Sequence, residues 1–310
     1  KFIVNDPEDN NTAKVTFFMG DHSARQIDTM TLLGNNEVVL GNSFIVMSRE
    51  EPRQESSPEI TRYVRLLSTK APLFEKVSEN TVLVRIPAFD HAFKKDIDAV
   101  IAKHLDTILK TENLIIDIRG NGGGSDVSYA SLLPILYTNP IRTVGMEYLS
   151  TELNNSRMLG FLQNPHFSEE EKQWAKDGYD ILNQHIGSYI NIDEDVTVET
   201  FDKIEPLPKS IGVLVDSSNG STAEQFLLAA KQSKKVKLFG QTTAGVLDIS
   251  NMYQTDSPSG VFTLHYSLTK SLRIPHMAID GVGIQPDYYI DGELPLYQWT
   301  SYTQKILEGM

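Results

Sequence analysis

The chain has 310 residues, a formal net charge of −13 and no cysteine. The acidic balance argues against a nucleic-acid or anionic-membrane partner, because both require a basic surface. The absence of cysteine excludes disulfides, thiolate metal sites and cysteine nucleophiles. No apolar run reaches the ~18 residues of a spanning helix, so we expect no membrane-spanning segment. The length predicts one large domain, or a large domain and a small one.

Short strands and turns are predicted near the start of the chain. Ala13–Met19 and Gln26–Leu33 flank the sequence Gly-Asp-His-Ser, which predicts a hairpin, and Val38–Met47 predicts another strand. Arg49–Glu59 is charged and contains two prolines, which favours an exposed linker. We place a domain boundary near residue 75.

Beyond this boundary, strands and helices alternate. Thr81–Ile86 is rich in β-branched residues, Lys94–Lys110 has apolar residues at helical spacing, and Asn113–Ile118 is continuously apolar. This order predicts a β-α-β unit whose strands pair in parallel within a covered sheet. The other predicted elements are helices over Ser125–Tyr137, Ser168–Ile186 (with Ser168 as N-cap) and Ser221–Ser233, strands over Ile211–Val215 and Lys235–Phe239, and a hairpin of Asn251–Thr255 with Val261–Ser267.

The strand over Asn113–Ile118 runs into four glycines, Gly120 and Gly122–Gly124. Ligands of open α/β sheets bind at the carboxyl ends of strands. Glycines there expose N–H groups, which can bind a phosphate or a developing oxyanion. A phosphate loop is excluded, since no Gly-Lys-Ser/Thr follows. We expect an anion-binding turn, and the alternative is a tight turn at positive φ.

Ser221 follows the next strand and Gly220, and it opens a predicted helix. A hydroxyl at this place lies at the positive end of the helix dipole, which stabilises an alkoxide or oxyanion. Ser221 and Glu224 also form the Ser-x-x-Glu pattern of a capping box, which needs no catalysis. The spacing alone leaves both interpretations open.

Four segments occur in a characteristic order: Leu114–Gly124, Val213–Glu224, Gly240–Gly245 and Gly281–Asp287. Together they resemble the C-terminal processing peptidases and tricorn-core-like peptidases, over roughly residues 80–290. This resemblance implies a serine endopeptidase that hydrolyses peptide bonds by acyl transfer, with peptides or unfolded proteins as substrates and no metal or cofactor.

The same resemblance implies the fold and the location of the protein. The fold expected is an α/β spiral of β-β-α units of the crotonase and Clp-protease type. Residues 1–75 then form a β-rich remnant of a PDZ-like module, and 76–310 form the catalytic domain, with a helical insertion over 140–208. The family branch implies a bacterial cell envelope location, periplasmic or on the outer surface; the chain itself carries no signal peptide at Lys1.

Ser221 matches the nucleophile of the family. The oxyanion hole of the family matches the backbone N–H groups of Thr222 and of the glycine turn, that is, Gly122, Gly123 and Gly124.

The general base of the family is not matched. Val246 stands where the processing branch has a lysine, and Arg85 stands where the tricorn branch has a histidine. Neither side chain is able to accept a proton at neutral pH. The alternative function is therefore a catalytically impaired pseudo-peptidase that binds peptides or serves as a scaffold. An acyl-CoA enzyme of the crotonase type is a more distant alternative.

Several residues are candidates to activate Ser221. His91, His276 and Lys270 are possible bases, and each also fits a solvated or structural position. Asp280 stands where the tricorn branch has an acidic catalytic residue that orients the base, and its alternative is a salt bridge with Arg273. Asp117 and Arg119, beside the glycine turn, are expected to pair with each other and brace the loop.

Overall fold

The computed structural model describes residues 57–163 and 168–309 in full, and the strands between residues 2 and 46. It divides the chain into two compact units, Lys1–Ser57 and Pro58–Met310. The expected boundary near residue 75 falls inside the second unit, because helix α1 (Pro58–Ser68) buries Leu66 in the core of that unit.

The N-terminal unit consists of antiparallel strands. Strands β1 (Phe2–Asp9), β2 (Thr12–Phe18) and β3 (Ala24–Thr31) form one sheet, in which β2 and β3 confirm the first predicted hairpin. The single strand expected over Val38–Met47 is instead a pair, β4 (Glu37–Leu40) and β5 (Ser43–Val46). Most of the expected linker, residues 49–56, lies outside the described residues.

A six-stranded sheet forms the centre of the second unit, in the order β17-β14-β13-β8-β7-β6. All neighbours pair in parallel except β6 with β7. Its strands are β6 (Leu73–Lys76), β7 (Thr81–Arg85), β8 (Asn113–Asp117), β13 (Ser210–Val215), β14 (Val236–Gly240) and β17 (Tyr288–Tyr289). Helix α2 (Lys94–Ile108) connects β7 to β8, which confirms the predicted β-α-β unit.

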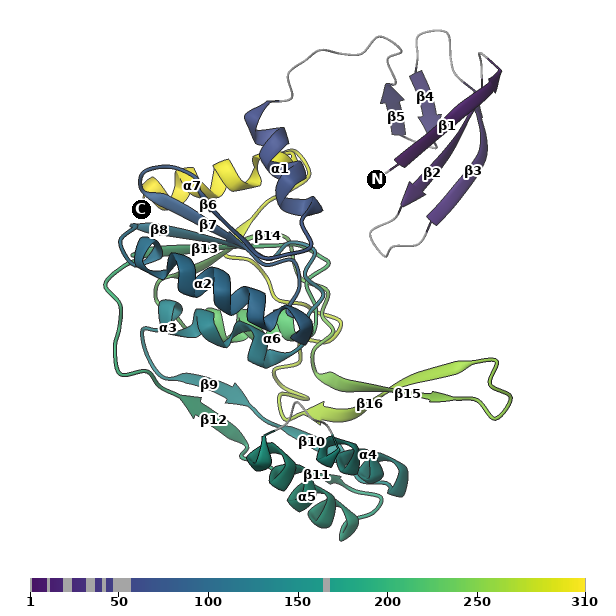
Figure 1. The fold of residues 1–310 in the computed structure, drawn as a ribbon, viewed down its shortest axis with the longest axis vertical. Coiled ribbons are helices and arrows are strands. Elements are labelled where there is room, and N and C mark those ends of the chain that lie inside the picture. The colour runs from purple at the N-terminus through teal and green to yellow at the C-terminus, as the bar shows by residue number, and fades with distance from the viewer. Residues whose placement is uncertain are drawn as a thin grey trace. The chain divides into compact units, whose positions relative to one another are not determined.

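Helices cover both faces of this sheet, giving a mixed α/β fold (Figure 1). On one face, α2 and α6 (Thr222–Ala230) pack side chains such as Ile97, Ile101 and Phe226 against alternate sheet residues. On the other face, Leu66 and Trp299 pack against the remaining sheet residues. The other helical elements are η1 (His91–Phe93), η2 (Asp126–Leu132), α3 (Leu133–Leu136), α6 (Thr222–Ala230), η3 (Leu296–Gln298) and α7 (Trp299–Gly309). Because η2 is a 3-10 helix, only part of the helix predicted over Ser125–Tyr137 is α-helical.

The segment over 140–208, expected to be a helical insertion, contains both helices and strands. Its elements are β9 (Ile141–Val144), β10 (Met146–Leu149), α4 (Glu152–Leu162), α5 (Glu169–Asn183), β11 (Tyr189–Ile190) and β12 (Val196–Glu199). Ser168 caps α5 through a capping box with Glu171, as its sequence predicts.

A long hairpin joins this insertion to the C-terminal part of the unit. Strands β15 (Ile249–Asp256) and β16 (Thr263–Ser271) confirm the predicted hairpin, and β16 pairs with β10 of the insertion. The resulting sheet has the order β11-β10-β16-β15 (Figure 1). Among the described residues, no helix has the length and apolar character needed to cross a membrane.

Candidate active site

The loops that follow β8 and β13 are bound to each other at the carboxyl ends of the two strands. The buried Asn219 donates from its side-chain nitrogen to the carbonyls of Ile118 (2.6 Å) and Asn121 (3.0 Å). Asp216 accepts the Gly120 amide at 3.1 Å. Unmade hydrogen bonds of buried amide groups are costly, so these contacts fix the glycine turn against the loop that carries Ser221.

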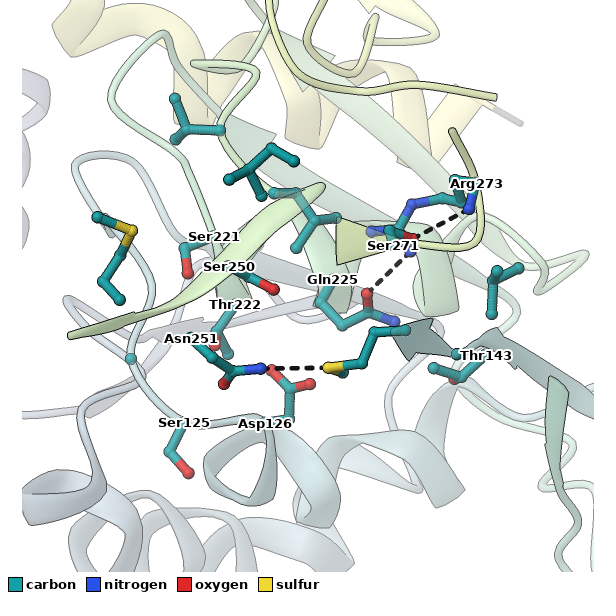
Figure 2. Close-up of a pocket in the computed structure, with 18 of the residues that line it drawn as sticks. Ser125, Asp126, Thr143, Ser221, Thr222, Gln225, Ser250, Asn251, Ser271 and Arg273 are labelled. Carbon is teal, nitrogen blue, oxygen red and sulfur yellow. Dashed lines mark hydrogen bonds between the residues drawn. The ribbon is translucent and has the colours of Figure 1, made fainter. Parts of the chain in front are cut away.

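Ser221 has an unusual backbone conformation at the start of α6. Its φ is 53° and its ψ is −125°, values that a non-glycine residue rarely adopts and that cost about 1–3 kcal/mol. Its side chain makes no capping hydrogen bond. The capping-box interpretation of this serine is therefore wrong, and its hydroxyl points instead into a pocket (Figure 2).

Glu224, the other residue of the supposed capping box, binds a different segment. Its buried carboxylate accepts the amides of Gly245 at 2.7 Å and Val246 at 2.9 Å, and also the Thr243 hydroxyl. These bonds hold the 243–246 segment beside the helix start. Val246 thereby reaches the site, since its side chain lies next to Gly220 and lines the pocket.

The glycine turn lies directly against the Ser221–Thr222 peptide. A Cβ on Gly123 would come within 2.9 Å of both the Ser221 Cβ and the Thr222 nitrogen. The Gly123 amide itself is used, because it donates to the Asn121 side chain at 2.9 Å. Within the described part of the chain, the amides of Gly124 and Thr222 donate to no protein acceptor, and both residues line the pocket.

The pocket has a volume of about 1170 Å³ and lies between the core and the insertion. Its walls come from the glycine turn, from the start of α6 and from the segment that leads into β15. The insertion contributes the stretch from Thr143 to Met146 and the Trp174 side chain. Substrate-sized pockets typically occupy 300–1,000 Å³, so a short peptide segment fits here.

Asp280 lines this pocket but is held by backbone groups. Its carboxylate accepts the amides of Leu247, Asp248 (2.6 Å) and Ile249 (3.0 Å). The alternative expected from the sequence, a salt bridge with Arg273, is wrong, because Arg273 pairs with the buried Asp248 at 2.7 Å. Asp280 therefore shapes the pocket wall by fixing the start of β15.

Asp126, the first residue of η2, is a second carboxylate in the pocket. Figure 2 shows its side chain pointing from η2 into the space between Thr222 and Gln225. Asp126 remains exposed to solvent, but partial desolvation by neighbouring protein atoms raises the pKa of its carboxyl group, and the Thr222 side chain and the charge of Arg273 offset only part of this effect. A carboxylate with a raised pKa beside a candidate nucleophile is a frequent feature of functional sites.

The histidine and lysine candidates lie outside the pocket. His91 is exposed at the start of η1, one residue after Asp90, which lies against Gly124. His276 is also exposed. Lys270 pairs with Glu147 at 2.9 Å and is therefore engaged in the contact between β16 and β10. No described histidine or lysine lines the pocket, and no cluster of metal-binding side chains occurs in the described residues.

The pair predicted beside the glycine turn is confirmed. The Arg119 guanidinium donates twice to the buried Asp117 carboxylate, at 3.0 and 2.7 Å. Arg85 joins this pair at 3.4 Å and also donates to the Leu66 carbonyl. Arg85 is thus a structural cation that ties α1 and β7 to the end of β8.

Sequence reasoning missed three residues of this site: Asn121, Asn219 and Asp126. The two asparagines flank the glycine-rich segments, where short polar side chains commonly bind nearby backbone. This tendency could have identified both asparagines from the sequence. Asp126 carried no signal of its own, because an acidic residue in the first turn of a helix is ordinary.

Comparison with known proteins finds relatives of this chain by sequence and, separately, by fold. An uncharacterized protein of Chlamydia muridarum (strain MoPn / Nigg) is 25% identical over 268 residues, covering 74% of this chain and 44% of that protein. The chain thus spans less than half of this curated relative. The model of Peptidase family S41 matches residues 80–290.

Two solved structures share the fold at low sequence identity. Mature CPAF complexed with lactacystin is 16% identical with a TM-score of 0.56, over 96% of this chain and 67% of that chain. A putative peptidase from Parabacteroides merdae ATCC 43184 is 16% identical with a TM-score of 0.50, over 79% and 68%.

Proposed function

The chain belongs to peptidase family S41, and from this membership we propose that it is a serine endopeptidase whose nucleophile is Ser221. The observation that carries the proposal is the conformation of Ser221: a strained residue at a helix start, with its hydroxyl free of the cap and directed into a large pocket. Strain of this kind persists where the surrounding structure over-determines it, and it concentrates at active sites.

The proposed reaction is acyl transfer. The Ser221 oxygen attacks the carbonyl carbon of the scissile peptide bond and forms an ester, and the amine half of the substrate leaves. Water then hydrolyses the ester. The amides of Gly124 and Thr222 stabilise the negative oxygen of the tetrahedral intermediates, and donors of this kind are worth about 10²–10³-fold each in rate.

For the general base we propose His91, which is exposed outside the pocket in this structure, so that η1 has to shift toward Ser221 when a substrate binds. His91 follows Asp90, which abuts Gly124, and Gly123 abuts Ser221 on the other side of the same turn. His91 takes the hydroxyl proton of Ser221 during attack and returns it to the leaving amine. Asp280 contributes as a positioning residue, through its bonds to the segment that leads into β15.

We extend the same proposal to three further features that the resemblance implies. They are the spiral arrangement of β-β-α units, peptides or unfolded proteins as substrates, and a location in the bacterial cell envelope. The mostly parallel sheet with helices on both faces supports the first, and membership of a peptidase family supports the second.

A fluorophosphonate probe tests the nucleophile, because it labels only an activated serine. We expect the wild-type protein to be labelled and to hydrolyse an unfolded protein, and Ser221→Ala to do neither. Ser218→Ala is the matched control, since Ser218 lies exposed in the same loop. We expect His91→Asn to keep the fold and to lose labelling by at least about 100-fold. A wild-type protein that neither reacts with the probe nor cleaves any peptide would support the pseudo-peptidase alternative instead.

A further inference from the structure

Three charged side chains line the pocket of Ser221: Asp126, Asp280 and Arg273. The charges of two of them, Asp280 and Arg273, are already bound by protein groups. Three backbone amides surround Asp280, and Arg273 pairs with Asp248, whose carboxylate is fully buried. Asp126 forms no ion pair with any described residue; the Thr222 side chain hydrogen-bonds to it, and the charge of Arg273, which itself pairs with Asp248, acts on it only from a distance. It is thus the charged group of the pocket that an incoming ligand is able to pair.

Asp126 lies close to the proposed reacting centre without touching the nucleophile. It is two residues beyond Gly124, and its carboxyl group is next to the Thr222 side chain (Figure 2). In the described part of the chain, no hydrogen bond connects Asp126 to Ser221. A substrate whose carbonyl is held at Thr222 therefore places a neighbouring side chain, rather than the scissile bond, against Asp126.

The environment of Asp126 favours a cation. Its carboxylate is exposed in the pocket and forms no ion pair with a described residue, so a positive group that enters the pocket is attracted to it. A lysine or arginine side chain also carries an apolar stem, which the pocket accommodates against Val144, Met146 and Leu247. The ammonium or guanidinium group then forms a charge-assisted hydrogen bond, which is stronger than a neutral one. An acidic substrate side chain would be repelled at the same place.

We propose, on the basis of the peptidase function above, that Asp126 determines specificity by selecting substrates with a lysine or arginine next to the scissile bond. The overall charge of −13 acts in the same direction, because it attracts basic peptides over a longer range.

The test uses peptides that differ at one residue: lysine, norleucine, which has the same stem length without the charge, and glutamate. For the wild-type protein we expect kcat/KM to be about 10–100-fold higher with lysine than with norleucine, and lowest with glutamate. In Asp126→Asn the lysine-to-norleucine ratio falls to near one, and in Asp126→Glu a preference for lysine remains. Glu79→Gln is the matched control, since it removes one charge at the amino-terminal end of β7, away from the site. Its ratio stays at the wild-type value.

A binding measurement separates this inference from the proposed catalysis. Calorimetry on Ser221→Ala should show the same preference for the lysine peptide, and the added Asp126→Asn change should remove it. Equal affinities for lysine and norleucine peptides, or a preference that survives Asp126→Asn, overturn the inference. A lysine preference in binding, together with a wild-type protein that hydrolyses nothing, supports the specificity role of Asp126 and contradicts the peptidase function.

Discussion

Gly123 lies so close to Ser221 that the glycine has no room for a side chain. A Cβ on Gly123 would meet the Ser221 Cβ at 2.9 Å and the Gly220 carbonyl oxygen at 2.8 Å. Gly123 also has a φ of +109°, which side-chain-bearing residues avoid. The glycine turn is therefore packed directly against the start of α6.

Gly123→Ala should separate these two segments. We expect a loss of about 2–4 kcal/mol in the free energy of unfolding, from overpacking and from backbone strain together. Labelling of Ser221 by a fluorophosphonate should fall with it. Gly122→Ala is the control for stability, because the nearest atom to its added Cβ lies 4.0 Å away. Urea unfolding of both variants measures the difference, and equal midpoints would contradict this account of the turn.

Glu224→Gln tests the unexpected role of Glu224, the second residue of the Ser-x-x-Glu pattern at the start of α6. The variant places an amide group against the amides of Gly245 and Val246, so at least one buried donor loses its acceptor. We expect a loss of about 1–3 kcal/mol in unfolding free energy and a lower rate of substrate turnover. Glu79→Gln, in an exposed turn, should change the unfolding free energy by less than about 0.5 kcal/mol. A Glu224→Gln variant as stable as this control would show that the bonds to the 243–246 segment contribute little.

Glu224 also shows where sequence reasoning stops. Periodicity and start signals predicted α2, α5 and the β7-α2-β8 unit, because those features are local. The Ser-x-x-Glu pattern is local too, and at Ser168 it forms the expected capping box. At Ser221 the same pattern fails, since the Glu224 carboxylate finds stronger partners in a segment about 20 residues further along the chain.

The electrostatic environment of the site depends even more on contacts between distant segments. The sequence indicated Ser221 and the glycine turn, because small residues at strand ends mark sites in α/β sheets. It gave no means to distinguish Asp126 from Asp280 as the unpaired carboxylate. That difference depends on which backbone amides turn toward each side chain after folding.

Asp117→Asn should destabilise the protein in a pH-dependent way. Burial by itself would raise the pKa of Asp117, but the charges and hydrogen bonds of Arg119 and Arg85 outweigh burial and hold the pKa below its usual range. A lowered carboxyl pKa adds stability above the unfolded pKa near 4, and this stability is lost as pH falls through the folded pKa. At pH 7 the variant leaves two buried arginines without their carboxylate, at a cost of about 3–5 kcal/mol.

The measurement is urea unfolding of wild type and Asp117→Asn at pH 7 and at pH 3. We expect the difference between the two proteins to shrink at the lower pH. Asp106→Asn is the matched control, because Asp106 forms an exposed pair with Lys110, which is worth about 0.3–0.5 kcal/mol. A difference that is the same at both pH values would contradict the assignment of a lowered pKa to Asp117.

Asp126→Asn should stabilise the protein at neutral pH, whereas Asp117→Asn destabilises it. The raised pKa of Asp126 means that the folded protein binds the proton more tightly than the unfolded chain does, so ionised Asp126 lowers the unfolding free energy. Arg273 and Tyr129 are the other titratable groups that face it, and neither removes this cost. The variant should therefore have a higher Tm than wild type at pH 7. The gain stays below about 1 kcal/mol, because solvent in the pocket screens the carboxylate.

As pH falls through the raised pKa, wild-type Asp126 becomes protonated and the two Tm values converge. Thermal unfolding followed by circular dichroism between pH 4 and 8 measures this. A lower Tm for Asp126→Asn at pH 7, with Asp106→Asn unchanged, would mean that ionised Asp126 stabilises the fold. It would then not be the unpaired carboxylate that a cationic substrate binds.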